Sequence, residues 1–246
     1  MEQKDLSTIH SYLNNLRESS RPLAIFDLDS TLYNVSPRTQ KIVRDFCLRD
    51  DVKQAYPKES STLVNISIQR NDWGYFEALD RHNFVSSVRF LKQLSKFWRQ
   101  NFFSNTYMDH DKTYQNASAF VNSITPLNCD IMYLTGRSQD KMLSGSLKNL
   151  KRDSFPIQNE NSLIMKTNPD LPDHIFKTSV IAEIKKNYEH IILFENEPKI
   201  LNRINIDHPE TMLCFIDSTH SRAESIKHAI PTIHMDYTPL LDPKNS

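Results

Sequence analysis

Short apolar segments recur along the chain and alternate with segments of helical periodicity. Near-continuous apolar runs of this kind are typical of strands buried on both faces of a parallel sheet. Helical spacing separates them, for example at Met142, Leu143, Leu147 and Leu150. Strands that alternate with helices predict an α/β fold with right-handed crossovers, here a Rossmann-like three-layer core with a parallel sheet. The six predicted strands are Leu23–Asp29, Asp130–Gly136, Ser162–Thr167, His190–Asn196, Met212–Asp217 and Pro231–Asp236.

One long stretch after the first predicted strand departs from this rhythm, because it contains no convincing buried strand. Ser36 and Pro37 predict a helix start, with Ser36 as the N-cap and Pro37 at the first helical position. A second long helical region is predicted over Tyr75–Phe103. The predicted organisation is therefore an α/β core at residues 1–34 and 110–246, with a mainly helical insertion at residues 35–109.

The composition excludes several classes of protein. Thirty Lys and Arg residues balance thirty Asp and Glu residues, and this zero net charge argues against a protein that coats nucleic acid. No apolar run is long enough to span a membrane, and the polar segment Met1–His10 does not resemble a secretory signal. Three glycines leave no glycine-rich nucleotide loop. Three scattered cysteines favour a reduced, cytoplasmic setting over a disulfide framework.

The sharpest chemical signal lies at the end of the first predicted strand, where Asp27 and Asp29 stand two residues apart. Strand periodicity points both side chains to the same face, and ligands bind at the carboxyl ends of strands in α/β sheets. Two neighbouring carboxylates repel each other, so such a pair persists where a cation or a shared proton compensates. Oxygen ligands of this kind suit Mg²⁺. The alternative is a helix N-cap beside a solvated aspartate in a turn.

Two further predicted strands end in polar residues. Thr135 and Gly136 close the second strand, where a hydroxyl and backbone N–H groups can bind a phosphate oxygen. Glu195 and Asn196 close another strand, where they can hold a metal from the opposite side, and Glu197 is a weaker candidate. Each of these positions alone is also consistent with an ordinary turn or a charged loop.

Two lysines are candidates for neutralising a phosphate and the carboxylates around it. Lys166 lies at the end of a predicted strand, and Lys177 lies at the start of a helix that leads into the strand before Glu195. Each can also be an ordinary surface lysine.

Together and in this order, these residues resemble the haloacid dehalogenase-like (HAD) superfamily of phosphotransferases. The shared pattern is Asp-x-Asp-x-Thr, then a Thr after a second strand, then a Lys, then an acidic fourth motif, and it covers Leu23 to about Asp236. The runs Asp-Leu-Asp-Ser-Thr-Leu, Phe-Glu-Asn-Glu-Pro and Ile-Asp-Ser-Thr-His-Ser are similar to an uncharacterised bacterial group of these hydrolases. The helical insertion is similar to what the superfamily calls a C1 cap.

The resemblance implies a phosphatase that works through an aspartyl-phosphate intermediate. Asp27 would attack phosphorus, and Asp29 would protonate the leaving oxygen and then activate water. It also implies that Mg²⁺ binds Asp27, the backbone carbonyl of Asp29 and Glu195, with Asn196 as a further ligand. The groups expected to bind the transferring oxygens are Thr135, Gly136, Lys177 or Lys166, and the N–H groups of Leu28 and Asp29.

The fourth motif and the motif lysine depart from the usual pattern of the superfamily, and the second aspartate indicates which reaction is catalysed. The fourth motif usually begins with Asp, whereas Glu195 is one methylene longer, so the metal would shift or be bound through water. The motif lysine is either Lys177 or Lys166, and its place at a helix start favours Lys177. Dehalogenases of the superfamily generally lack the second aspartate, because a halide needs no proton, so Asp29 favours phosphate chemistry.

Three other features have two interpretations each. Arg137 follows the Thr-Gly turn and either reaches a phosphate or forms a surface salt bridge. His220 and Asp217 close another predicted strand, and His220 either contacts substrate or shapes a loop. A set of basic residues interleaved with aromatic ones suggests either a surface for single-stranded nucleic acid or an amphipathic helix with a wet basic face, and the zero net charge favours the helix. These basic residues are Arg89, Lys92, Lys96 and Arg99.

We therefore expect a Mg²⁺-dependent cytoplasmic phosphatase for a small phosphorylated metabolite of the nucleotide or sugar phosphate class. Neither nucleic acid nor a membrane is expected as a partner, and the pattern leaves open the oligomeric state and the choice between Mg²⁺ and Mn²⁺. The alternatives are a phosphatase for nucleic-acid ends and a non-catalytic phosphate-binding module on the same scaffold.

Overall fold

The computed structural model describes residues 9, 12, 21–159 and 162–241. The chain divides into two compact units, the first within residues 1–33, 113–139 and 150–246 and the second within residues 34–112 and 140–149.

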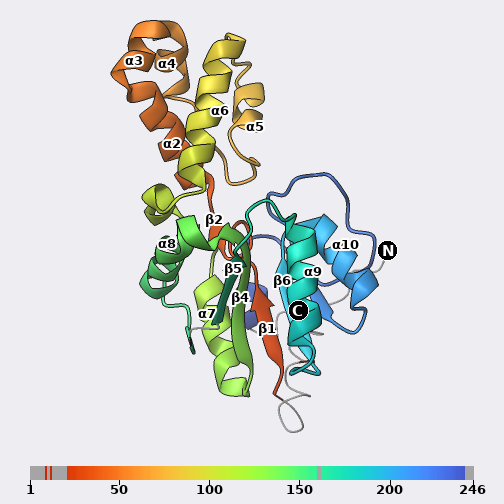
Figure 1. The fold of residues 1–246 in the computed structure, drawn as a ribbon. Helices are drawn as coiled ribbons and strands as arrows, with labels where there is room; N and C mark the ends of the chain where they lie inside the picture. Colours follow the sequence, from red (N-terminus) through yellow and green to blue (C-terminus); the bar gives the residue numbers. More distant parts are fainter. Residues whose placement is uncertain (1–8, 10–11, 13–20, 160–161, 242–246) are drawn as a thin grey trace. The chain divides into compact units, whose positions relative to one another are not determined.

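The first unit is built on a six-stranded parallel sheet in the order β5-β4-β1-β6-β7-β8 (Figure 1). Five of the strands lie within the runs predicted from the sequence, β4 extends two residues beyond its run to Ser138, and the predicted α/β, Rossmann-like fold class is confirmed. The strands are β1 (Leu23–Phe26), β4 (Asp130–Ser138), β5 (Leu163–Lys166), β6 (Ile191–Glu195), β7 (Met212–Ile216) and β8 (Thr232–Ile233).

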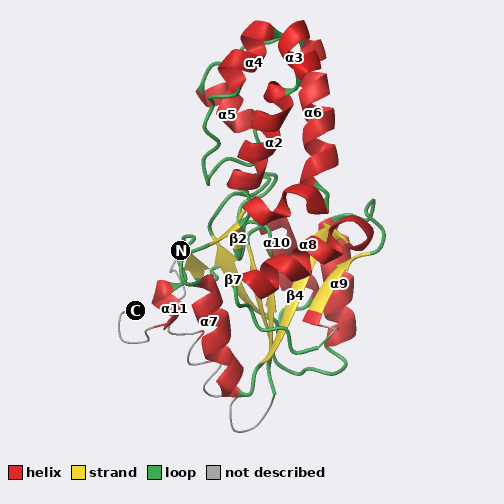
Figure 2. Ribbon diagram, turned by 90° about the vertical axis from the view of Figure 1, so that its left-hand side faces the viewer, coloured by secondary structure: helices red, strands yellow, loops and turns green. Residues whose placement is uncertain are grey.

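Helices cover both faces of this sheet, with α7 on one side and α9 on the other (Figure 2). Successive strand residues point to opposite faces. Leu23 and Ile25 of β1 therefore join an apolar cluster with α9 and α10, whereas the ring of Phe26 packs against Phe120 of α7. Burial on both faces explains the near-continuous apolar runs. This unit includes the helices α7 (Ala117–Ile124), α9 (Asp173–Ile184), α10 (Pro198–Asp207) and α11 (Thr238–Leu241), with the 3₁₀-helix η2 (Thr125–Leu127).

The second unit is mainly helical and has its own apolar core, in which Phe46 of α2 packs against Phe90 of α6. The short strands β2 (Tyr33–Asn34) and β3 (Lys112–Thr113) pair where the chain leaves and re-enters the first unit. None of the described helices is long and apolar enough to cross a membrane. The helices are α2 (Ser36–Leu48), α3 (Asp50–Ala55), α4 (Pro57–Leu63), α5 (Phe76–Arg81), α6 (Val88–Phe102), the 3₁₀-helix η1 (Asn105–His110), and α8 (Gln139–Arg152), of which residues 140–149 belong here.

The helical boundaries differ from the sequence-based expectation at two places. The region Tyr75–Phe103 is not one helix, because Asn83 adopts a left-handed φ of 49° and the hydroxyl of Ser87 starts a new helix by accepting the N–H of Phe90 at 3.2 Å. Ser36 is not the N-cap of α2 but its first residue, and its N–H donates to the side-chain oxygen of Asn34 at 3.0 Å. The side chain of Asn34, two residues earlier, thus satisfies the first N–H group of the helix, while the N-cap position itself is occupied by Val35.

A buried ion pair lies within the second unit. The guanidinium of Arg38 approaches the carboxylate of Asp111 at 3.0 Å, and both side chains are fully buried. Arg38 also donates to the carbonyl of Phe102 at 3.1 Å and lies 4.0 Å from the centre of its ring. A buried charge needs such compensation, because the desolvation penalty of an unpaired ion is several kcal/mol.

We expect the substitution Asp111→Ala to lower the free energy of unfolding by about 3–5 kcal/mol, because it leaves the Arg38 guanidinium buried without its counter-ion. Urea unfolding followed by circular dichroism measures the change. Asp109→Ala is the matched control: Asp109 pairs with Lys148, both side chains are more than half exposed, and a loss of less than about 1 kcal/mol is expected. Similar losses in the two variants would contradict the importance of the buried pair.

Candidate active site

The carboxyl ends of β1 and β6 lie side by side and bring Asp27 next to Glu195. Phe26 stands opposite Phe194 in the register, and their rings stack with centroids 4.5 Å apart. The N–H of Asp27 donates to the carbonyl of Phe194 at 3.0 Å. Both acids therefore reach the edge of the sheet where α/β proteins bind ligands.

Lys177, in the first half of α9, connects these two acids. Its Nζ donates to Oδ1 of Asp27 and to Oε2 of Glu195, each at 2.6 Å. The exposed fractions of the three side chains are 3% for Lys177, 7% for Asp27 and 1% for Glu195. Three charges are thus held together at a place that water barely reaches, where electrostatic interactions are stronger than at the surface.

Burial dominates the electrostatics of this cluster. It raises the pKa of Asp27, an effect that Lys177 opposes and the nearby Asp29 reinforces. It also raises the pKa of Glu195 to about 7, against the influence of Lys177. Burial alone would lower the pKa of Lys177, but the two carboxylates outweigh it and raise that pKa. One ammonium group therefore stands against two buried carboxyl groups, whose pKa values stay raised in its presence.

Asp27 and Glu195 fit the requirements of a bound Mg²⁺ ion. The described residues contain no group of three or more His, Cys, Asp or Glu side chains that would form a complete site. Mg²⁺, however, is usually bound through one or two carboxylates, with waters and substrate phosphates as the other ligands. Two carboxylates and one ammonium leave a net charge of about −1, which a divalent ion would reverse and make complementary to a phosphate.

The turn after β1 directs Asp29 toward Arg137. The carbonyl of Leu28 accepts the N–H groups of residues 31–33, and Ser30 adopts a left-handed φ of 63°. Arg137 donates from Nε to Oδ1 of Asp29 at 3.1 Å, and its Nη2 forms an ion pair with the same oxygen. The exposed fractions of these side chains are 2% for Arg137 and 28% for Asp29. Arg137 therefore forms a salt bridge with a predicted site residue, and its guanidinium is buried rather than on the surface.

Thr135 and Gly136 lie close to this pair, in the second half of β4, which continues to Ser138. Thr135 is buried, and its hydroxyl accepts the N–H of Arg137 at 3.3 Å. A β-carbon on Gly136 would lie 2.4 Å from Oδ2 of Asp173, so glycine allows the close approach of this carboxylate. Asp173 was not singled out in the sequence, where its place at a helix start was the only signal.

The two candidate lysines have different surroundings. Lys166 donates from Nζ to Oδ1 of Asp173 and to the carbonyl of Pro169, both at 2.9 Å. Lys177 instead contacts Asp27. This geometry favours Lys177 as the lysine of the site and gives Lys166 a role in holding Asp173.

Hydrogen bonds of the polar side chains of Glu195 and Asn196 stabilise the loop after β6. Oε1 of Glu195 accepts the N–H groups of Asn196 and Glu197, each at 3.0 Å. The side chain of Asn196 accepts the hydroxyl of Thr31 at 3.1 Å and donates to the carbonyl of Thr219 at 2.7 Å. Asn196 therefore links the loops after β1, β6 and β7, and its neutral amide makes it a weaker candidate ligand than the carboxylate of Glu195.

A hollow of about 430 Å³ lies beside the loops after β6 and β7 and is bordered by Pro198, Asp217 and His220. Nδ1 of His220 accepts the N–H of Arg222 at 3.1 Å, which supports its interpretation as a residue that shapes this loop. The carboxylate of Asp217 approaches His234 at 2.8 Å.

Solved structures with a similar fold cover nearly the whole chain. A HAD-superfamily hydrolase from Ehrlichia chaffeensis has a TM-score of 0.53 at 12% sequence identity, over 93% of this chain and 98% of that one. A structure from Clostridium acetobutylicum, described as a predicted phosphatase, has a TM-score of 0.50 at 13% identity, over 88% and 95%. The chain has the HAD superfamily fold.

The resemblance seen in the sequence motifs is thus confirmed at the level of the fold. Protein Tyrosine Kinase A of Mycobacterium tuberculosis is also similar, with a TM-score of 0.52 at 12% identity over 88% of this chain and 94% of that one. No protein-family model and no curated protein sequence matches the chain. Because one HAD-like fold carries different chemistries, the activity of this chain has to be argued from its own side chains.

We expect Lys177→Met to lower the free energy of unfolding by about 3–5 kcal/mol at neutral pH, because Asp27 and Glu195 would stay buried without their cation. Lys166→Met is the matched control, since its partner Asp173 is half exposed and can be hydrated. Urea unfolding of both variants beside the wild type measures the difference. Equal destabilisation would show that the buried cluster does not depend on Lys177.

Proposed function

We propose that the protein is a Mg²⁺-dependent phosphatase that hydrolyses a small phosphomonoester through an aspartyl-phosphate intermediate. The observation that carries this proposal is the buried cluster in which Lys177 contacts both Asp27 and Glu195 at the carboxyl edge of the sheet. The descriptions of similarly folded structures as a hydrolase and as a predicted phosphatase agree with it.

In the proposed reaction, a carboxylate oxygen of Asp27 attacks phosphorus while the bond between phosphorus and the ester oxygen breaks. Asp29 gives a proton to the departing oxygen, so that it leaves as an alcohol. Asp29 then takes a proton from a water molecule, which attacks the phosphoryl group and releases inorganic phosphate and free Asp27. Arg137 keeps the Asp29 carboxyl in one orientation through both steps.

The remaining site residues would bind the oxygens of the transferring phosphoryl group. Lys177 supplies a positive charge, and Thr135 and Gly136 supply a hydroxyl and a backbone N–H group from the second half of β4. Asp27 and Glu195 would hold Mg²⁺, which when bound neutralises charge on the phosphoryl group. The N–H groups of Leu28 and Asp29 in the turn after β1 complete the set.

The second unit corresponds in its place along the chain to a C1-type cap. Residues 34–112 follow β1 directly and precede the segment that leads to β4. Caps of this kind exclude bulky substrates, which supports a small phosphorylated metabolite of the nucleotide or sugar phosphate class.

We expect Asp27→Asn to lower the rate of phosphate release by about 10⁴-fold or more, since the amide is a poor nucleophile and effects of this size follow loss of a nucleophile. The measurement is phosphate release from a panel of phosphomonoesters with and without Mg²⁺. Asp207→Asn, a surface carboxylate of α10 in the same unit, is the control and should keep full activity. Turnover that persists in a folded Asp27→Asn protein would exclude Asp27 as the nucleophile.

We expect Asp29→Asn to slow leaving-group release from an alkyl phosphate by about 10²–10⁴-fold, because the alkoxide cannot leave without a proton. The loss should be much smaller with p-nitrophenyl phosphate, whose leaving group departs as an anion. Arg137→Gln should also slow the reaction of the alkyl phosphate more than that of p-nitrophenyl phosphate, but by a smaller factor than Asp29→Asn. Arg137→Lys should restore part of the activity that Arg137→Gln loses.

Single-turnover measurements with the two esters isolate the first chemical step, which is the one that uses Asp29 as an acid. Equal losses on both esters would mean that Asp29 and Arg137 support the structure of the site and take no part in proton transfer.

A further inference from the structure

The zero net charge of the chain conceals opposite charges on its two units. Residues 34–112 and 140–149 contain 15 Lys and Arg against 10 Asp and Glu, a net charge of +5. The rest of the chain contains 15 Lys and Arg against 20 Asp and Glu, a net charge of −5. The neutrality that argued against a polyanionic partner therefore does not apply to the second unit taken by itself.

Part of this positive charge gathers on one side of α6. Its cations follow one another at spacings of three and four residues, which places them on the same helix face, and the helix contains no acidic residue. At 1.5 Å per residue they extend over about 15 Å. We call this set the basic stripe; it consists of the exposed residues Arg89, Lys92, Lys96 and Arg99.

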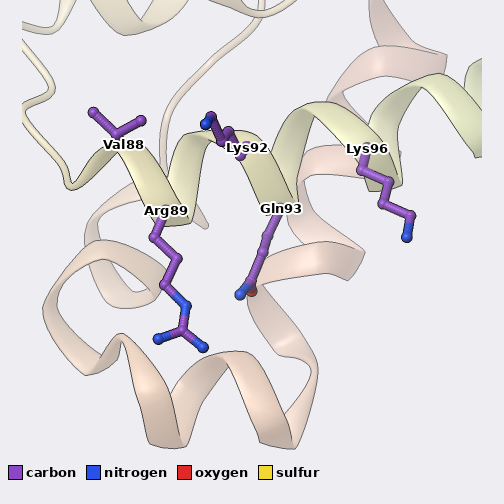
Figure 3. A pocket seen from close by; sticks show the side chains of 5 residues that line it. All are labelled: Val88, Arg89, Lys92, Gln93 and Lys96. Atoms are coloured by element: carbon purple, nitrogen blue, oxygen red, sulfur yellow. The ribbon is translucent and has the colours of Figure 1, made fainter.

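An open hollow of about 520 Å³ lies along this part of α6 (Figure 3). Arg89, Lys92 and Lys96 line it together with Val88 and Gln93. Gln93 adds a side-chain amide, which also donates to the hydroxyl of Tyr56 at 3.4 Å. The hollow thus offers three cations and one neutral hydrogen-bonding group, a set that suits an anionic ligand.

The basic stripe has no ion partners among the described residues, whereas many other cations of the same unit do. Like charges three or four residues apart destabilise a helix by about 0.2–0.5 kcal/mol per pair, and the stripe contains three such pairs with no compensating acid. An external polyanion would offset this repulsion. The paired cations elsewhere in the unit are Arg38 with Asp111, Lys41 with Asp45, Arg49 with Asp51, Lys53 with Asp50, Arg81 with Asp72, and Lys148 with Asp109.

The opposite face of α6 is occupied by the core of its own unit. Phe90 and Leu94 are fully buried, and the ring of Trp98 packs against Tyr75 and Phe102. The helix therefore cannot turn an apolar face into a membrane. Nor do these aromatic rings offer a platform on which bases can stack, so recognition would rest on charge.

We propose that the basic stripe of α6 binds the phosphate backbone of a nucleic-acid strand, without regard to base sequence. Regularly repeated phosphates are the partner that matches a row of unpaired Arg and Lys side chains on a rigid helix. The proposal departs from the expectation, drawn from the charge of the whole chain, that nucleic acid is not a partner. The proposal does not depend on the phosphatase activity, because binding is separate from turnover.

The test is the salt dependence of binding to a dye-labelled oligothymidylate whose ends carry no phosphate, measured by fluorescence anisotropy on the full chain. Four phosphate contacts predict a slope of about −2.8 in a plot of log affinity against log salt concentration, or about a 50-fold loss from 50 to 200 mM. Lys92→Gln with Lys96→Gln should reduce the slope to about −1.4 and the loss to about 7-fold.

Lys141→Gln with Lys148→Gln is the matched control, since it removes two exposed lysines from α8 in the same unit and should leave the slope unchanged. Equal thermal unfolding of the variants excludes a folding effect. Absence of binding at low salt would overturn the proposal, as would an equal loss in the two double variants. Binding to phosphatidylserine vesicles in place of the oligonucleotide would also overturn it and assign the stripe to a membrane surface.

Discussion

The ammonium group of Lys177 stands between two carboxylates that are almost completely withdrawn from water. Burial raises the pKa of Asp27 and of Glu195, and Lys177 opposes this rise at both acids. The arrangement constrains the fold, because α9 has to deliver Lys177 while β1 and β6 deliver the acids at the same level. A slip of one residue between these strands would turn one carboxylate to the other face of the sheet.

A second ion pair, between Asp29 and Arg137, lies at the same edge of the sheet as the pair of Asp27 and Lys177. Asp27 is enclosed and bonded to a lysine, whereas Asp29 is partly open to solvent and bonded to Arg137 from β4. The two aspartates are close in the chain but have different partners and different access to water. Such a difference in surroundings is how two like carboxyl groups acquire unlike chemical roles.

Much of this architecture could be predicted from the chain because it depends on local patterns. The strands were visible because burial on both faces leaves few polar positions in them. The partner of Arg137 was not visible, since it lies 108 residues away and depends on the pairing of β1 with β4. The break between α5 and α6 was not predicted, because the apolar pattern continues through it. Asn83 ends one helix there and Ser87 starts the next.

The buried pair of Arg38 and Asp111 has a consequence for the order in which the chain folds. The two residues stand near opposite ends of the segment 34–112, so their contact brings the ends of this long segment together. The entropic cost of pairing β1 with β4 grows with the length of free chain between them. Once the helices of the second unit have formed through local contacts, that free chain is effectively short. The insertion then connects β1 to β4 as a short loop would. The entropic cost of pairing these two strands is lower than the length of the intervening sequence suggests.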